Sequence, residues 1–395
     1  MQRAHLTLRV LSILGIATAF AACANPGSSD NVTPSGTTRD SRTRAGRSLG
    51  PDNVVEFAYV VNLSSGNVSA YKINGHTGAL TALTGSPFSA GSNPYDISID
   101  PAGGYAYVTD YGSGEVSAYS INPTSGALSA VSGSPFTATA PYGIGVDSTG
   151  KFAYVANLTA SGISEYLIGN GTGTLSSAGP PFSAGSYPIA VAADPIAGYL
   201  YVANEQSNDV SGYSINPING NLTAVTGSPF TADSQPYGIV VDPQGKFVYV
   251  PNYSSNDISA YTILSGGELR RAENSPFAGG PSPIHAVVDP QHRFLYVTDF
   301  GGAEISGFSI NANTGALTAL TGSPFSAGSN PVDVSVEPRG KFAYVTNYTS
   351  NNVLGYKIQS SGALIELHGA PATGTGPEGI ATCLVAGGTC KPPPL

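Results

Sequence analysis

Phe-Val-Tyr-Val-Pro-Asn, at residues 247–252, is one copy of a pattern that occurs seven times in this chain of 395 residues. Its Tyr-Val pair recurs every 47 or 48 residues, and an Asn or Asp follows each of these tyrosines by three positions. The tyrosines are Tyr59, Tyr107, Tyr154, Tyr201, Tyr249, Tyr296 and Tyr344. Repeats of this length are typical of propellers and solenoids.

Each repeat predicts four short strands, as the copy around Tyr249 shows. An apolar run is followed by Asp-Pro-Gln-Gly-Lys at residues 242–246, where Pro and Gly occupy positions that suit a turn. The third segment alternates apolar and polar side chains, as a half-buried strand does, and the fourth is short and polar, as an outer edge strand should be. We expect these strands at residues 236–241, 247–250, 258–263 and 268–271.

The expected inner strands are offset from the Tyr-Val strands in a way that closes a ring. They begin at Pro94, Pro141, Pro188, Pro236, Pro283, Pro331 and Pro377. The first Tyr-Val strand has no full inner strand before it, and the last inner strand, residues 379–384, has no outer strands after it. The sequence therefore predicts an all-β fold, a seven-bladed β-propeller of four-stranded blades over residues 51–395, closed by the C-terminal strand. A right-handed solenoid, the structural alternative, needs no such complementary ends.

The first 50 residues have a different character. Arg3 and Arg9 accompany a short apolar run that has the length of a signal-peptide core and cannot span a bilayer as a helix. The Phe-Ala-Ala-Cys ending resembles the bacterial lipobox, so we expect a lipoprotein signal peptide at residues 1–22 and lipidation of Cys23, with cleavage without lipid as the alternative. Residues 23–50 are rich in Ser, Thr, Gly and Pro and predict a flexible tether.

The cysteines agree with an exported protein. Cys383 and Cys390 remain as a pair in a short loop, and export to an oxidising compartment predicts a disulfide between them. Two thiols do not make the four-ligand shell of a structural metal site. We expect the chain at the cell envelope, held to a membrane by its lipid. Ala24 differs from the Asp associated with inner-membrane retention, which favours the outer membrane or the periplasmic face.

Charge argues against one class of partner. Residues 1–50 hold six of the 16 Lys and Arg residues and two of the 25 Asp and Glu residues, so the remainder has a formal net charge of −13. Nucleic-acid binding needs clustered Lys and Arg side chains against phosphates. We therefore expect no nucleic-acid partner.

Two stretches carry a family resemblance. Phe-Ala-Tyr-Val-Ala-Asn at residues 152–157 and Phe-Ala-Tyr-Val-Thr-Asn at residues 342–347 resemble the YVTN-type propeller repeat. Residues 242–250 resemble the seven-bladed lactonase-like family, which includes 6-phosphogluconolactonase-type enzymes. The resemblance implies the propeller fold and, as an activity, hydrolysis of sugar lactones. Such a hydrolase would use His or basic groups to polarise the lactone carbonyl.

The third position of the inner-strand pattern supplies the candidate catalytic residue. It holds His285 in one repeat, Asp96 and Asp333 in two others, and Gly or Ala elsewhere. We take His285 as the candidate general base, with a structural histidine hydrogen-bonded at a loop as the alternative. Asp96 and Asp333 are candidate ligand-binding residues that could converge with His285 around the axis. Two carboxylates and a His could also bind a divalent cation. No local ligand spacing supports this alternative, and we expect no metal and no cofactor.

Four tyrosines are candidate ligand contacts. Tyr95, Tyr142 and Tyr237 each follow the inner-strand proline, and Tyr187 precedes one. Aromatic rings beside Asp side chains suit sugar binding, through stacking and hydrogen bonds. Packing between the ends of the blades is the alternative.

The sequence specifies a regular propeller fold but shows no evident set of catalytic residues. The favoured prediction is therefore a lipid-anchored ligand-binding or protein-interaction module of the cell envelope. Its expected partners are the membrane, a carbohydrate or sugar-derived ligand, or other envelope proteins. The alternative is a lactonase-like hydrolase of sugar lactones that uses His285 and neighbouring Asp residues.

Overall fold

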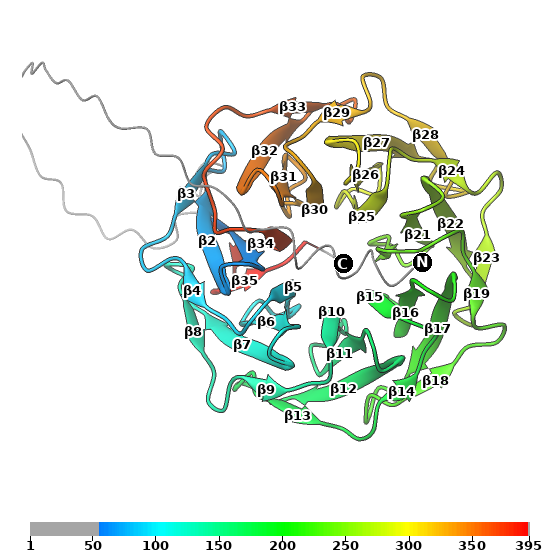
Figure 1. Ribbon diagram of the computed structural model, residues 1–395, viewed down its shortest axis with the longest axis horizontal. Helices are drawn as coiled ribbons and strands as arrows, with labels where there is room; N and C mark the ends of the chain where they lie inside the picture. Colours follow the sequence, from blue (N-terminus) through cyan, green and yellow to red (C-terminus); the bar gives the residue numbers. More distant parts are fainter. Residues whose placement is uncertain (1–54, 394–395) are drawn as a thin grey trace, which may run out of the picture. The chain divides into compact units, whose positions relative to one another are not determined.

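The computed structural model describes residues 55–393, which form seven β-sheets. The sheets are blades around a common axis, and this arrangement confirms the predicted seven-bladed propeller (Figure 1). No helix among these residues is long and apolar enough to cross a membrane. The predicted signal peptide (residues 1–22), the lipidation site Cys23 and the tether (residues 23–50) lie outside the described residues.

Each blade has an inner, a second, a third and an outer strand, joined as antiparallel neighbours. The inner strands are β5 (Pro94–Ile99), β10 (Pro141–Val146), β15 (Pro188–Ala193), β20 (Val240–Val241), β25 (Pro283–Val288), β30 (Pro331–Val336) and β34 (Pro377–Ala386). The second strands are β1 (Glu56–Asn62), β6 (Tyr105–Asp110), β11 (Phe152–Asn157), β16 (Tyr199–Asn204), β21 (Phe247–Asn252), β26 (Phe294–Asp299) and β31 (Phe342–Asn347).

The outer half of each blade repeats with equal regularity. The third strands are β2 (Asn67–Ile73), β7 (Glu115–Ile121), β12 (Gly162–Ile168), β17 (Asp209–Ile215), β22 (Asp257–Ile263), β27 (Glu304–Ile310) and β32 (Asn352–Ile358). The outer strands are β3 (Leu80–Ala82), β8 (Leu128–Ala130), β13 (Leu175–Ser177), β18 (Leu222–Ala224), β23 (Leu269–Arg271), β28 (Leu317–Ala319) and β33 (Leu364–Glu366). Six two-residue strands also pair with the third strands: β4 (Phe88–Ser89), β9 (Phe136–Thr137), β14 (Phe182–Ser183), β19 (Phe230–Thr231), β24 (Phe277–Ala278) and β29 (Phe325–Ser326).

The inner strand of the fifth blade is shorter than the sequence predicts. Its first residue, Pro236, forms only an isolated bridge to Asn252, and the regular strand begins at Val240. The neighbouring strand carries Pro251, whose carbonyl accepts a hydrogen bond from the N–H of Tyr237. Because the N–H and C=O of a strand residue point to the same side, the donor that proline lacks would have faced this inner strand. The shortening therefore follows from a missing ladder hydrogen bond.

The C-terminal strand closes the ring as predicted. β34 pairs antiparallel with β1, with Tyr59 opposite Ala381, and so completes the first blade. β34 then turns back into β35 (Thr389–Lys391), and a disulfide joins Cys383 to Cys390 across this hairpin. The N–H of Cys390 donates to the carbonyl of Gly103 in the second blade. Gly103 has a φ of 76°, and a Cβ there would lie 2.2 Å from the backbone of Cys390, so glycine is required.

Tyrosine hydroxyls join neighbouring blades. Each Tyr of the seven Tyr-Val pairs is fully buried and donates to a glycine carbonyl in the outer turn of the adjacent blade, at 2.7–3.2 Å. Six tyrosines of the third strands donate to a carbonyl of the blade on the other side, at 2.5–3.1 Å. The seventh position is Phe308, which has no hydroxyl. Buried hydroxyls need such partners, so the repeated tyrosines fix how blades pack.

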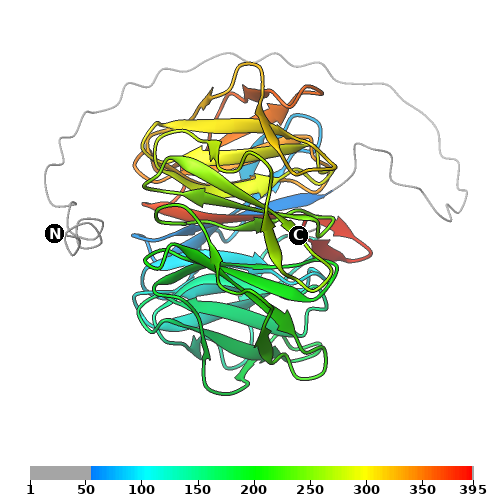
Figure 2. The ribbon, with the colours of Figure 1, turned by 90° about the vertical axis from the view of Figure 1, so that its right-hand side faces the viewer.

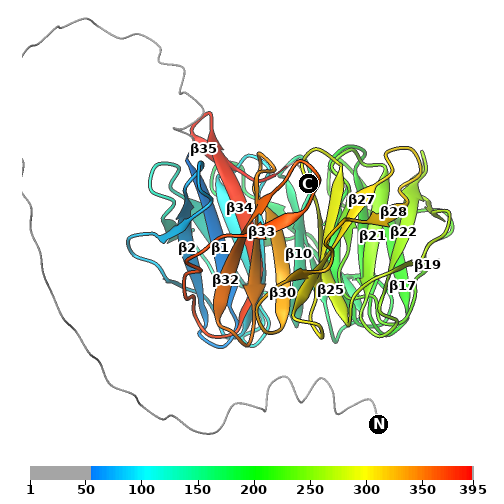
Figure 3. The same ribbon diagram turned by 90° about the horizontal axis from the view of Figure 1, so that it is seen from above.

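The ring has two unlike faces, between which the strands run (Figures 2 and 3). We call the end where the inner strands begin the loop face, because the loops between second and third strands lie there. We call the opposite end the turn face, because it carries the turns between inner and second strands, such as residues 242–246. The β34–β35 hairpin projects beyond the other strands at the turn face (Figure 3).

Candidate functional site

His285 and Asp333 meet on neighbouring inner strands. His285 is the third residue of β25 and directly follows a register irregularity that begins at Pro283. Such irregularities re-aim side chains near the edge of a sheet. Nδ1 of His285 lies 3.3 Å from Oδ1 of Asp333 in β30, and the two side chains expose 23% and 12% of their surfaces. They form a largely buried ion pair that solvent can still reach.

Asp333 and Asp96 are held by backbone N–H groups of two blades. Oδ1 of Asp333 accepts from Val334 at 2.7 Å, and Oδ2 accepts from Ile380 of the next inner strand at 2.9 Å. Asp96 repeats this arrangement in the second blade, where it accepts from Ile97 at 2.7 Å and from Ile144 at 2.9 Å. Each carboxylate therefore caps an N–H of the neighbouring inner strand, which compensates for burial of its charge.

Glu378 is a fourth member of this group, and the sequence interpretation missed it. It is the second residue of β34, is 4% exposed, and acts electrostatically on His285. A signal was available: Pro-Glu-Gly at residues 377–379 has Glu where Pro-Tyr-Gly at residues 141–143 and 236–238 has Tyr. We call His285, Asp333, Asp96 and Glu378 the axial cluster.

The axial cluster sets the charge of its histidine. Burial by itself would lower the pKa of His285, but the three nearby carboxylates outweigh burial and raise it to about 9. Burial raises the pKa of Asp96 to about 6, against the backbone N–H groups and His285, which lower it. At neutral pH His285 is therefore protonated and a proton donor, which differs from the general base expected from the sequence. Asp96 is then a carboxylate whose pKa lies close to neutral.

Three of the candidate tyrosines lie packed at the loop face, next to the axial cluster. The hydroxyl of Tyr237 lies 3.2 Å from that of Tyr95 and 3.0 Å from that of Tyr142, and the rings of Tyr95 and Tyr142 are 3.6 Å apart. Each of the three exposes less than a tenth of its surface. They share a core with Ile189, Ile284 and Val332, the residues at the same position of other blades. The structure brings them together as an aromatic layer, and ligand contact by them stays a prediction.

A second set of aromatic residues borders this layer and is more exposed. Tyr111, Tyr253, Phe300 and Tyr348 each follow the Asn or Asp that ends a second strand, and Tyr187 lies in the same cluster. Tyr111 meets Tyr142 edge to face, with ring centroids 5.8 Å apart. The 47- or 48-residue spacing could have revealed these positions, because they occupy one place in the repeat.

Positively charged Lys and Arg side chains lie away from the axial cluster. Over residues 55–393, no Lys or Arg lies on an inner strand. Five of them lie in the turns between inner and second strands, at the turn face: Lys151, Lys246, Arg293, Arg339 and Lys341. In the same part of the chain, no group of three or more His, Cys, Asp or Glu side chains is arranged to hold a metal ion. The axial cluster thus has an excess of negative charge.

Comparison with known proteins agrees with this architecture. The sequence matches the family model described as lactonase, seven-bladed β-propeller, over residues 47–233 and 224–382. Candidate 6-phosphogluconolactonases from Bacteroides uniformis and Bacteroides fragilis superpose with TM-scores of 0.74 and 0.73, at 19% and 18% identity. The periplasmic gluconolactonase of Pseudomonas aeruginosa has a TM-score of 0.72 at 17% identity. In each pair the match covers 84% of this chain and 99% of the other. No curated protein matches the sequence.

Proposed function

Because this chain belongs to the lactonase family of seven-bladed β-propellers, we propose that it hydrolyses a sugar lactone at the axial cluster. The observation that carries the proposal is the ion pair of His285 and Asp333 beside a second carboxylate, Asp96, whose pKa of about 6 is close to neutral. Catalytic sites need an acid and a base with pKa values set apart by their surroundings, and the axial cluster supplies both.

His285 and Asp96 suit the two requirements of ester hydrolysis, which are a proton donor for the carbonyl oxygen and a base for the attacking water. Protonated His285 can donate a hydrogen bond to the lactone carbonyl oxygen and stabilise the negative charge that develops there, while Asp333 keeps the imidazolium charged. Asp96 can accept a proton from the attacking water. The water oxygen bonds to the carbonyl carbon, the ring C–O bond breaks, and the leaving alkoxide takes a proton to give the open hydroxy acid.

The charge of the axial cluster favours an uncharged lactone. Three carboxylates face a single imidazolium, and no Lys or Arg of residues 55–393 lies on an inner strand to bind a phosphate. A phosphorylated lactone would bring further negative charge to this site without a matching cation. We therefore propose glucono-δ-lactone or a similar neutral sugar lactone as the substrate class.

Hydrolysis of glucono-δ-lactone by the purified chain, measured against a buffer blank, tests this function. His285→Ala should lower kcat about 100-fold, since removal of one stabilising donor has effects of this size. His76→Ala is the matched control because His76 is exposed in an outer turn, and it should keep full activity. Equal activity of the two variants, with both melting as the unchanged chain does, would contradict the proposal.

A binding function without turnover is the second candidate. It is supported by the partly exposed rings at the loop face (Tyr111, Tyr253, Phe300 and Tyr348), since exposed aromatic rings suit sugars. Saturable binding of a neutral sugar without lactone turnover would favour it over the hydrolase.

We also propose that the chain works at the cell envelope, on the periplasmic face or the outer membrane, anchored by a lipid on Cys23. The signal-like residues 1–22 support this location, and the Cys383–Cys390 disulfide fits an oxidising compartment. Labelled fatty acid should be incorporated by the chain in cells and not by Cys23→Ser. Equal labelling of both would contradict lipidation at this residue.

A further inference from the structure

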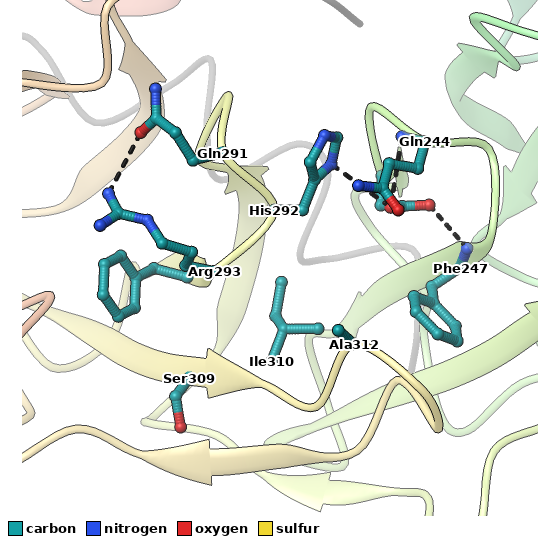
Figure 4. Close-up of a pocket in the computed structure, with 10 residues that line it drawn as sticks. Gln244, Phe247, Gln291, His292, Arg293, Ser309, Ile310 and Ala312 are labelled. Atoms are coloured by element: carbon teal, nitrogen blue, oxygen red, sulfur yellow. Dashed lines mark hydrogen bonds and ion pairs between the residues drawn. The ribbon is translucent and has the colours of Figure 1, made fainter.

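A cavity lies at the turn face between the fifth and sixth blades, away from the axial cluster (Figure 4). Its volume is about 410 Å³, within the range of small-molecule pockets. Figure 4 shows His292 between the Gln291–Arg293 side and the Gln244–Phe247 side, with Ile310 and Ala312 beneath. Polar and apolar side chains thus share one site.

His292 departs from the repeat at this cavity. The turn between inner and second strands has Gly at this place in four other blades, with φ of 64° at Gly245 and 67° at Gly340. His292 adopts a φ of 61°, a conformation that bulky side chains rarely take. A strained residue persists where the surroundings hold it and often marks a functional site. Its Nδ1 lies 3.6 Å from Oδ2 of Asp242 in the fifth blade, so the imidazole lies beside the neighbouring turn without a hydrogen bond to it.

Asp242 and Asp289, the carboxylates that begin these two turns, already accept hydrogen bonds within their own turns. Asp242 accepts hydrogen bonds from the N–H groups of Gln244, Lys246 and Phe247. Asp289 accepts from the backbone N–H groups that follow it and from the guanidinium of Arg293, at 3.0 and 3.2 Å. They are therefore poor ligands for a free cation.

The remaining groups suit a neutral hydroxylated molecule. Arg293 is balanced by Asp289 and stacks on the ring of Phe294, with 4.7 Å from its Cζ to the ring centroid. Its charge is thus already matched, and the site has no surplus cation for an anion. The side-chain amide of Gln244 is exposed and offers both a donor and an acceptor. Ile310 provides an apolar surface next to it.

We infer that this cavity binds a neutral polyhydroxylated molecule of monosaccharide size, with His292 and Arg293 as hydrogen-bond donors and Ile310 against the sugar ring. The site is independent of the axial cluster: hydrolysis at His285 does not require it.

Methyl NMR of the full chain, labelled at isoleucine and titrated with D-glucose, tests the inference. The methyl signal of Ile310 should shift saturably. Ile215 is the matched reference, because it ends the equivalent third strand of the fourth blade, and its signal should stay in place. Gluconate and inorganic phosphate are the charged probes and should bind more weakly than glucose. Tighter binding of either anion, or no saturable shift of Ile310, would overturn the inference.

His292→Gly separates a ligand-binding role from a structural one. Glycine is the residue of the repeat at this turn and relieves the strained conformation, so the variant should melt at the same temperature as the unchanged chain or higher. Glucose binding should weaken about tenfold through the lost donor, while lactone hydrolysis stays unchanged. Unaltered glucose binding in this variant would contradict the assigned role of His292.

Discussion

The third position of the inner strands divides the ring into two unlike halves. Blades three, four and five carry Gly143, Ala190 and Gly238 there, whereas blades six, seven and two carry His285, Asp333 and Asp96. Blade one, which lies between blades seven and two, carries Gly379 at this position. In the first half neighbouring inner strands touch. A Cβ added at Gly143 or Gly238 would lie 2.6 or 2.3 Å from a carbonyl oxygen of the next blade.

In the second half, side chains connect neighbouring inner strands, whereas in the first half the backbones of these strands are in direct contact. Asp96 and Asp333 each reach the next inner strand and accept one of its N–H groups. The same repeat unit thus builds a packed half, where this position holds only Gly or Ala, and a charged half, where function is proposed. Residues that depart from the repeat are therefore more informative about function than residues that keep it.

Neutralising the charged half should have the largest effect on activity. Asp333→Asn removes the carboxylate 3.3 Å from His285, which should lower the pKa of His285 and reduce kcat/KM by about 10- to 100-fold. Kinetics and an NMR titration of His285 measure the two effects. Glu273→Gln, at an exposed surface position, is the control and should change neither. An unchanged titration of His285 would show that the pair does not set its charge.

Adding a side chain to the packed half should damage stability instead. Gly238→Ala places a methyl group against the carbonyl of Ile284 and should lower the free energy of unfolding by about 1–3 kcal/mol. Gly145→Ala is the matched control, since its Cβ would meet Val191 at an ordinary 3.4 Å. Thermal unfolding compares the two. Equal melting temperatures would mean that close strand contact is not what distinguishes this half.

Stability should depend on pH because the ring contains buried carboxyl groups with raised pKa values. Burial raises the pKa of Asp299 to about 7, and burial together with Glu337 raises that of Glu56 to about 8, although Arg339 lowers it. The folded chain therefore binds more protons than the unfolded chain between about pH 4 and 8, so stability should fall as pH rises. The raised pKa of His285 acts in the same direction up to about pH 9. The melting temperature should be several degrees higher at pH 5 than at pH 8.5.

Glu56→Gln removes a buried carboxyl group with a strongly raised pKa, so the melting temperature of this variant should change less with pH. A melting temperature that rises from pH 5 to pH 8.5 in the unchanged chain would contradict the buried-acid account.

The smallest expected effect concerns the hydroxyls between blades. Tyr261→Phe removes the hydrogen bond to the carbonyl of Thr231, at 2.7 Å, and should cost about 1 kcal/mol. Phe308 occupies the same place in the sixth blade, so the chain already contains this substitution once. Chemical denaturation measures the change. No loss of stability would show that these hydroxyls fit the packing without strengthening it.

The sequence predicted the fold because the repeat is local and regular. The spacing of Tyr-Val pairs gave seven blades, and the unmatched segments at the two ends gave the closure through β34. The short inner strand β20 was not predicted, since it depends on the missing N–H of Pro251 in a neighbouring strand. Composition and repeat spacing do not show which backbone hydrogen bonds between neighbouring strands are missing.

For the candidate site, the sequence predicted the repeat positions of the residues but not the contacts between their side chains. Sequence placed His285 and Asp333 at one repeat position in consecutive blades, but their 3.3 Å contact depends on rotamers and on the register irregularity at each strand. Glu378 was missed because its position is apolar or aromatic in other blades. Four tyrosines were predicted as one group, and the structure separates the buried Tyr95, Tyr142 and Tyr237 from the half-buried Tyr187. The half-buried rings that follow the second strands were not predicted.

The most direct test of the proposed site is the pH dependence of kcat/KM for glucono-δ-lactone. If Asp96 acts as base and His285 as acid, the rate should rise through about pH 6 and fall through about pH 9, and His285→Ala should lose the upper limb. A flat profile above the buffer blank, or the same two limbs in His285→Ala, would show that the axial cluster does not perform the reaction.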